Sequence, residues 1–312
     1  MKMNEPQTYS PADSTSPPRS LASRYVLGAL AALALPAITS VAYAEDAPPS
    51  RSHALVNFEF SDKYLTPRGM IVQNEGLVFQ NLVLGFFNLY GSDAFSATLV
   101  GGIWNCYGTE SLPASGGGST HWYEIDPIAG MSFGIAKNFT LDVTYTAFNM
   151  QILAFPGGPA LGTSQHLETK LSFKDADLLG NFALSPYISF WKELKNKAVA
   201  STDANPEESF YFDIGIAPSY TLKDLGLKLE LPCRVLTADS SFYGTGAGSH
   251  SAIGLYELGV KASMPLKFMP AGYGSWSSHL GVRYMDFVDD NLIATQGRDD
   301  TWQVYGGITT FF

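Results

Sequence analysis

The sequence predicts an all-β fold: a single up-and-down antiparallel transmembrane β-barrel of about twelve strands. Three observations predict it. Apolar residues recur at every second position along most of the chain, short and long connections alternate, and only 15% of the 312 residues are charged, against about 25% in soluble domains. A soluble β-sandwich is the alternative, but it has no reason to collect every long loop at one end, and its solvent face should be rich in Lys and Glu.

The last segment, 301–312, shows the alternation most plainly. One face is mostly apolar, with Trp302, Val304, Gly306, Ile308, Thr310 and Phe312, and the other is mostly polar, with Thr301, Gln303, Tyr305, Gly307, Thr309 and Phe311. Soluble chains usually end in polar, frayed residues, whereas this one ends on two phenylalanines. It resembles the terminal strands of bacterial outer-membrane β-barrels. That resemblance implies contact with outer-membrane lipid and recognition by the barrel assembly machinery through the strand ending at Phe312.

Alternation and turn chemistry delimit the other strands in order. Segment 139–150 alternates cleanly, with Leu141 and Val143 against Thr140 and Asp142, whereas 77–90 is almost wholly apolar. The twelve predicted strands are 53–63, 77–90, 94–105, 121–136, 139–150, 164–174, 182–194, 208–221, 226–238, 251–264, 275–288 and 301–312. Short turns follow the even-numbered strands, including Gly91-Ser92-Asp93 and Lys137-Asn138. Long loops follow the odd-numbered ones, including 64–76, 106–120 and 289–300. An even-stranded barrel with both termini in the periplasm has this rhythm.

The N-terminus has the pattern of a targeting segment. Arg19 and Arg24 precede the apolar run 25–38, and Ala42 and Ala44 form an A-x-A cleavage pattern. A signal anchor is the alternative, but this run is shorter than the ~20 residues that a membrane-spanning helix needs. The predicted domains are therefore a signal peptide over 1–44, a short linker over 45–52 and the barrel over 53–312.

The inward faces are mostly Gly, Ser and Thr with scattered charges of both signs. The predicted lumen-lining charges are Glu59, Glu124, Asp126, Asp142, Glu168, Lys170, Asp213, Lys228, Glu230, Arg234, Glu257, Lys261 and Arg283. Such charges either pair across the lumen and fill a solid barrel or line a wet pore. The small inward residues favour a narrow open passage, and the acidic excess favours cations or neutral solutes. Aromatic girdles at the two membrane interfaces are expected from the outward residues Tyr123, Tyr145, Phe173, Tyr220, Tyr284 and Trp302.

Enzyme and metal patterns are weak in this sequence. Barrel lipases carry His-x-Ser on one strand, and none of the five histidines is followed by Ser two positions later. Glu124 and Asp126 share a face as paired carboxylates do, but the sequence favours the interpretation that they are two lumen-lining acids. Asp-rich residues over 289–300 suit a solvated loop better than a Ca²⁺ site. No catalytic residue, metal or cofactor is expected.

Two further expectations concern the cysteines and the partners. Cys106 and Cys233 are predicted on opposite walls, too far apart for the ~5.5 Å Cα separation of a disulfide. The net charge of −10 argues against nucleic acid as a partner. The sequence leaves open whether the barrel is a monomer or an oligomer.

A narrower resemblance concerns the first predicted loop. Ser61-Asp62-Lys63-Tyr64 followed by Arg68-Gly69 is similar to the SxYxxRG-like segment that opens the barrels of TorF-type porins, with one extra residue before the arginine. The resemblance covers a small part of the chain and implies a pore. We therefore expect an outer-membrane pore for diffusion of small solutes. A structural or surface-binding barrel without an open pore, or a lipid-modifying barrel enzyme, is the alternative.

Overall fold

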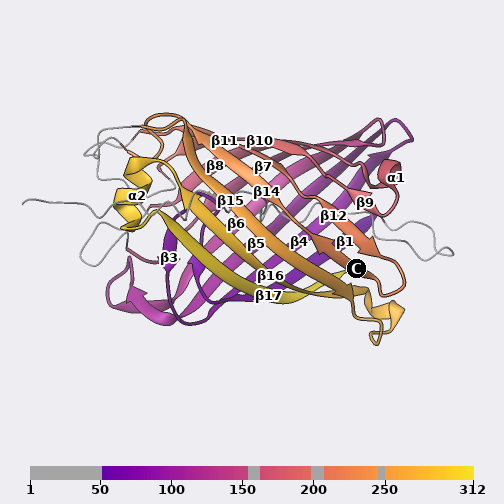
Figure 1. Cartoon of the computed structure of the whole chain (residues 1–312), viewed down its shortest axis with the longest axis horizontal. Coiled ribbons are helices and arrows are strands. Elements are labelled where there is room, and N and C mark those ends of the chain that lie inside the picture. Colours follow the sequence, from indigo (N-terminus) through magenta and orange to yellow (C-terminus); the bar gives the residue numbers. More distant parts are fainter. Residues whose placement is uncertain (1–50, 154–161, 198–206, 245–249) are drawn as a thin grey trace, which may run out of the picture.

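The computed structural model describes residues 51–153, 162–197, 207–244 and 250–312. Within them the chain forms a closed antiparallel barrel of twelve wall strands (Figure 1). We call each wall strand a stave, because three of the twelve consist of two shorter strands in succession. The staves are β1 (Ser52–Ser61), β4 (Val78–Gly91), β5 (Phe95–Pro113), β6 (Ser119–Ile135), β7 (Phe139–Phe148), β8 (Ser164–Phe173), β9 (Phe182–Ala183) with β10 (Tyr187–Lys195), β11 (Phe210–Ile216) with β12 (Ser219–Leu222), β13 (Leu227–Glu230) with β14 (Cys233–Ala238), β15 (Ile253–Pro265), β16 (Ser275–Phe287) and β17 (Asp300–Phe311). This confirms the predicted fold class.

The barrel closes where the two ends of the chain meet. β1 pairs antiparallel with β17, from Leu55 opposite Phe311 to Ser61 opposite Tyr305, and its other edge pairs with β4. Each remaining stave pairs with its neighbours in sequence. Pairing of β1 with β17 joins the two ends of the sheet, and such closure suits the hydrocarbon region of a membrane, where an open sheet edge would leave backbone groups unpaired.

The short elements mark the two ends of the barrel. The C-terminus and α1 (Ala176–Leu179) lie at one end, which we call the short-turn end, and α2 (Asp290–Gln296) lies at the other, the long-loop end (Figure 1). A two-stranded sheet of β2 (Tyr64–Leu65) and β3 (Ile71–Gln73) lies between β1 and β4 in the sequence. A 3₁₀ turn spans Ala271–Tyr273. Neither described α-helix is long and apolar enough to cross a membrane.

Alternation places apolar side chains outside and charged ones inside. On β11, Ile214 is 44% exposed and its neighbour Asp213 is 8% exposed. On β1, Phe58 and Phe60 are exposed while Glu59 between them is buried. A buried acid between exposed apolar residues is the reverse of a soluble sheet and fits a strand with lipid on one face and the lumen on the other.

Three staves are broken where the sequence predicted continuous strands. Pro186, Pro218 and Pro232 interrupt the seventh, eighth and ninth staves, because proline has no N–H to donate to the ladder. Pairing continues past the breaks, and the Leu231 N–H donates to the Pro218 carbonyl at 2.7 Å.

The predicted loop 106–120 is mostly strand, so that expectation was wrong. β5 and β6 continue as a hairpin to Pro113 and Ser119. A bulge between Cys106 and Tyr107 shifts the register, and Trp122 rather than Tyr123 then pairs with Tyr107 on the outer face. Tyr123 is fully buried inside, so its predicted place in an aromatic girdle is corrected.

Two further expectations concern the N-terminal segment and the two cysteines. The predicted signal peptide and nearly all of the linker fall in residues 1–50, outside the described residues, and stay predictions. Cys106 and Cys233 are both free, on β5 and β14 with β6, β7, β8, β10 and β11 between them.

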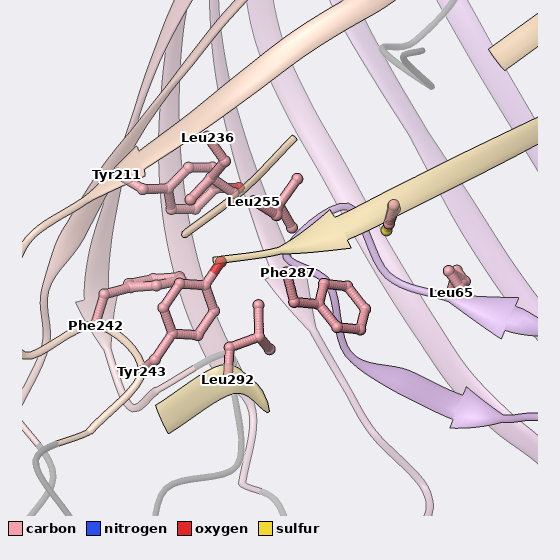
Figure 2. Close-up of a cluster of buried hydrophobic side chains, with 9 residues drawn as sticks. Leu65, Tyr211, Leu236, Phe242, Tyr243, Leu255, Phe287 and Leu292 are labelled. Carbon is pink, nitrogen blue, oxygen red and sulfur yellow. The ribbon is translucent and has the colours of Figure 1, made fainter. Parts of the chain in front are cut away.

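The interior is less uniformly polar than the sequence predicted. At the long-loop end, Leu65, Tyr211, Leu236, Phe242, Tyr243, Leu255, Met285, Phe287 and Leu292 form a buried cluster, the loop-end cluster (Figure 2). At the other end, Leu55, Leu82, Leu84 and Phe86 form a second one, the short-turn cluster, against Trp104 and Phe311. The interior therefore contains an apolar cluster near each end in addition to its charged side chains.

Candidate functional site

The lumen contains a piece of its own chain. Residues 62–77, which we call the plug segment, connect β1 to β4 and fold back inside the long-loop half of the barrel instead of extending outward. Leu65 joins the loop-end cluster, while Tyr64 packs with Val78, Cys106 and Tyr123 in a third buried cluster. The expected first outer loop is thus an internal plug.

A tight turn forms the tip of the plug segment. The Gly69 N–H donates to the Thr66 carbonyl at 3.0 Å, with Pro67 and Arg68 at the central positions. Pro67 suits the first central position because its φ is preset. Gly69 has φ of +87°, and a Cβ there would lie 2.8 Å from Leu255 Cδ2, so both the backbone angle and the space require glycine.

Wall side chains hold the tip through its main-chain carbonyls. Arg234 Nη2 on β14 donates to the Pro67 carbonyl at 2.6 Å, and the Tyr243 hydroxyl donates to the Arg68 carbonyl at 2.9 Å. Burial raises the pKa of Tyr243 well above its usual value, so the phenol keeps the proton that it donates. These bonds fix the backbone of the tip independently of the Arg68 side chain.

The flanks of the plug segment contact different staves. The Tyr64 hydroxyl donates to Glu124 on β6, and the Tyr123 hydroxyl donates to Gln73 Oε1 at 2.5 Å. Gln303 on β17 donates to the Lys63 carbonyl at 2.6 Å. Burial, reinforced by the Glu124 charge, raises the pKa of Tyr64 well above its usual value, so this phenol is also a donor.

The Arg68 side chain lies deep in the lumen, only 3% exposed. Its guanidinium carbon is 4.3 Å from the centre of the Phe148 ring. Glu124 and Tyr211 lie within electrostatic range of the guanidinium. In the part of the chain that the structure describes, Arg68 forms no ion pair, and its Nε has no hydrogen-bond partner.

A belt of paired charges lines one side of the lumen, on the adjacent strands β11, β14, β15, β16 and β17. Arg234 Nη1 contacts Asp213 Oδ1 at 2.6 Å, and Arg234 Nε contacts Glu257 Oε2 at 2.6 Å. Arg283 Nη1 lies 3.7 Å from Glu257 Oε1, and its Nε donates to Gln303. These partners lie on neighbouring staves, so the charges pair along the wall and not across the lumen.

The predicted lumen charges fall into several groups. Glu124 accepts from Tyr64 of the plug segment, and Asp126 accepts from the Asn149 N–H at 2.9 Å. Asp213, Arg234, Glu257 and Arg283 form the belt. Lys170 lies opposite Asp142 in the ladder and 4.5 Å above the Tyr187 ring, and Glu168 accepts from Ser189 at 2.6 Å. Lys228, Glu230 and Lys261 form a separate half-buried set, with Lys228 and Glu230 2.7 Å apart. Glu59 instead contacts His279 at 3.2 Å. That they line an open passage stays a prediction.

Sequence reasoning missed the residues that fill the lumen. Arg68, Phe148, Tyr211, Tyr243 and Gln303 were not on the predicted lining. Gln303 was placed on the polar face of the last strand, and Tyr211 shares a strand face with the predicted Asp213, so alternation alone could have added both. Arg68 lay in the segment resembling the TorF-type opening, and its flanking Pro67 and Gly69 marked a tight turn, but nothing local indicated that the turn points inward.

A serine and a histidine do meet on β8, in the reverse order of the lipase pattern. Ser164 Oγ lies 2.8 Å from His166 Nε2 and donates to the Asn196 carbonyl at 3.0 Å. Because the hydroxyl proton goes to a carbonyl, Nε2 must itself be the donor to Ser164. His166 is therefore not placed as a base for Ser164, and its Nδ1 has no hydrogen-bond partner among the residues that the structure describes.

The Asp-rich loop is partly helical and not simply solvated. Asp289 caps α2, where its Oδ1 accepts from the N–H groups of Asn291 at 2.9 Å and Leu292 at 3.2 Å, a usual role for Asp. Among the described residues, no three His, Cys, Asp or Glu side chains are grouped as metal ligands.

The fold and the filled lumen define a β-barrel of the outer-membrane type. No protein-family model matches the sequence, and no curated protein matches it. Among solved structures, the COG4313 outer membrane channel from Pseudomonas putida F1 is similar at a TM-score of 0.50 with 13% identity, over 87% of this chain and 100% of that one. The β domain of the Bordetella autotransporter BrkA has a TM-score of 0.43 with 11% identity, over 84% and 99%. The similarity to the COG4313 channel shows a shared fold.

Proposed function

We propose that this chain is a bacterial outer-membrane channel for small solutes and that the plug segment is its gate. The observation that supports this most is the belt of Asp213, Arg234, Glu257 and Arg283 inside a closed barrel. Buried charges are costly, and a barrel that served only as a scaffold could fill this space with apolar side chains. Ionisable groups at membrane depth usually mark a path for ions or solutes.

The proposed orientation places the short-turn end and both termini in the periplasm, with the plug segment entering from the outer side. Barrels of this kind have short periplasmic turns and longer outer loops. The acidic excess of the lumen charges supports a preference for cations or neutral solutes over anions.

Conductance of the refolded full-length protein in a planar bilayer tests this proposal. We expect brief, infrequent current steps, and a reversal potential in a KCl gradient that indicates cation preference. A heat-modifiable gel shift confirms beforehand that the barrel is folded. Folded protein that gives no current step at any voltage would overturn the proposal.

That same outcome would favour a second function, a barrel without an open passage whose long-loop end contacts other molecules. The specific observation in its favour is that apolar clusters occupy both ends of the lumen. Liposome swelling separates the two, because a channel admits small sugars or amino acids and a closed barrel does not.

A further inference from the structure

We propose that the Arg68 side chain occupies a binding site for organic cations and that the channel's solutes are small molecules carrying a guanidinium or ammonium group. The inference rests on the proposed channel function and names its substrate class. In this structure the plug segment places its own guanidinium where the solute's cationic group would bind, so solute and plug compete for one site.

The surroundings of Arg68 have the composition of a cation site. The Phe148 ring lies 4.3 Å below the guanidinium, within the range where an aromatic face attracts a cation. Tyr211 stacks on Trp191 at 5.7 Å, and Trp191 lies 6.4 Å from Phe148, so an aromatic wall continues beyond the first ring. Aromatic cages are a common way of binding organic cations.

Negative charge lies beside this aromatic wall. Glu124 and Asp126 of β6 both lie within electrostatic range of Arg68. Both acids are buried, and Glu124 already accepts a hydrogen bond from Tyr64. A cation leaving this position would take away the positive charge that faces the buried Glu124 carboxylate, so another cation is the favoured replacement.

Arg68 is poorly matched to a purely structural role. A buried arginine that braces a fold normally forms close ion pairs and uses its donors fully, as Arg234 does with Asp213, Glu257 and Pro67. Arg68 leaves Nε unpartnered and forms no ion pair within the described part of the chain. The tip is held by its carbonyls, so the side chain can leave the site without breaking those bonds.

A binding experiment on the full-length refolded protein tests this inference. The probe is butylguanidinium, measured by calorimetry in detergent, with butylurea as the neutral isostere and butyrate as the anion. Arg68→Gln empties the site of charge, and Arg68→Lys keeps a cation in it. Arg298→Gln is the matched control, because Arg298 is exposed and contacts Asn74 of the same segment.

We expect Arg68→Gln to bind butylguanidinium about tenfold or more tightly than the wild type, while Arg68→Lys and Arg298→Gln stay close to the wild type. Adding Glu124→Gln to Arg68→Gln should remove the gain. Equal binding by wild type and Arg68→Gln, or a gain that butylurea or butyrate shares, would overturn the inference.

Conductance separates failure of this inference from failure of the channel proposal. Variants that conduct but show no selective binding of butylguanidinium would refute the cation site and leave the channel standing. Selective binding by Arg68→Gln without conductance in any variant would refute the channel and leave a cation-binding barrel.

Discussion

The two ends of the lumen are filled by different parts of the chain. At the long-loop end a separate segment, residues 62–77, enters the barrel and is held at its tip by two hydrogen bonds to main-chain carbonyls. At the short-turn end the obstruction consists of wall side chains, Leu55, Leu82, Leu84 and Phe86. A segment can move out without disturbing the ladder, whereas wall side chains can only change rotamer. In the proposed channel, the plug segment is therefore the removable barrier and the short-turn cluster is the fixed one.

The largest expected effect comes from breaking the fixed end. Phe86→Ala removes a ring that is 5% exposed and should lower the free energy of unfolding by about 3–5 kcal/mol, because it leaves a cavity in a packed cluster. Urea unfolding in lipid vesicles measures this. Phe87→Ala is the control, since Phe87 lies on the outer face and is 49% exposed, so loss of its ring leaves no internal cavity. Equal losses in both variants would contradict the inward packing of the cluster.

Gly69→Ala should loosen the removable end. The new Cβ would lie 2.8 Å from Leu255 Cδ2 and 3.1 Å from Leu292 Cδ2, at φ of +87°, a strain of about 1–3 kcal/mol. We expect more frequent channel openings in a planar bilayer, while the barrel stays folded. Gly91→Ala is the control, because a Cβ there meets nothing within 4 Å. Unchanged opening frequency in Gly69→Ala would show that the tip does not need this turn.

Tyr243→Phe removes one of the two hydrogen bonds that hold the tip of the plug segment and leaves the aromatic ring in place. The Arg68 carbonyl loses the donor at 2.9 Å, and a buried acceptor without its partner costs about 1–3 kcal/mol. Hydrogen exchange followed by mass spectrometry should then show faster exchange in residues 62–77 with no change in β1 or β17. Faster exchange throughout the barrel would instead mean that Tyr243 supports the wall.

The smallest effect concerns the loop that carries Tyr243. The Ser241 hydroxyl, which donates to Asp239 at 2.7 Å, lowers the pKa of Asp239, and Ser209 donates to the same carboxylate at 3.0 Å. A depressed carboxyl pKa adds stability above the unfolded value of about 3.9, and that stability is lost as the pH falls through the folded pKa. In Ser241→Ala, exchange in residues 239–244 should be faster at neutral pH and equal to the wild type in acid. A difference that persists in acid would contradict this assignment.

The sequence predicted those parts of the structure that depend on the alternation of apolar and polar residues along each strand. Ile214 and Asp213 fall on opposite faces because neighbouring residues of a regular strand do, and the even strand count makes the first and last strands antiparallel, as they are where β1 pairs with β17. The chain path of the plug segment was not predictable in this way. Pro67 and Gly69 specify a turn, but whether that turn points into the lumen depends on Arg234 and Tyr243, more than 160 residues away.

Two other differences between the predicted and the observed structure have local causes, one on β6 and one on β4. One bulge beside Cys106 reverses the facing of Tyr123, because a shift of one residue exchanges the two faces of a strand. On β4 both faces are apolar, with Leu82 and Leu84 inside and Val83 outside, so alternation carried no signal there and the short-turn cluster was missed. The lumen charges were recoverable from alternation, but their pairing along the wall depended on the strand register.

The most direct test of the removable barrier is the single-channel conductance of a chain in which residues 64–73 are replaced by a flexible Gly-Ser linker. If the plug segment is the gate, this protein should show sustained conductance where the wild type shows brief openings, with the remaining resistance set by the short-turn cluster. A folded barrel with the linker whose current record matches the wild type would contradict the account.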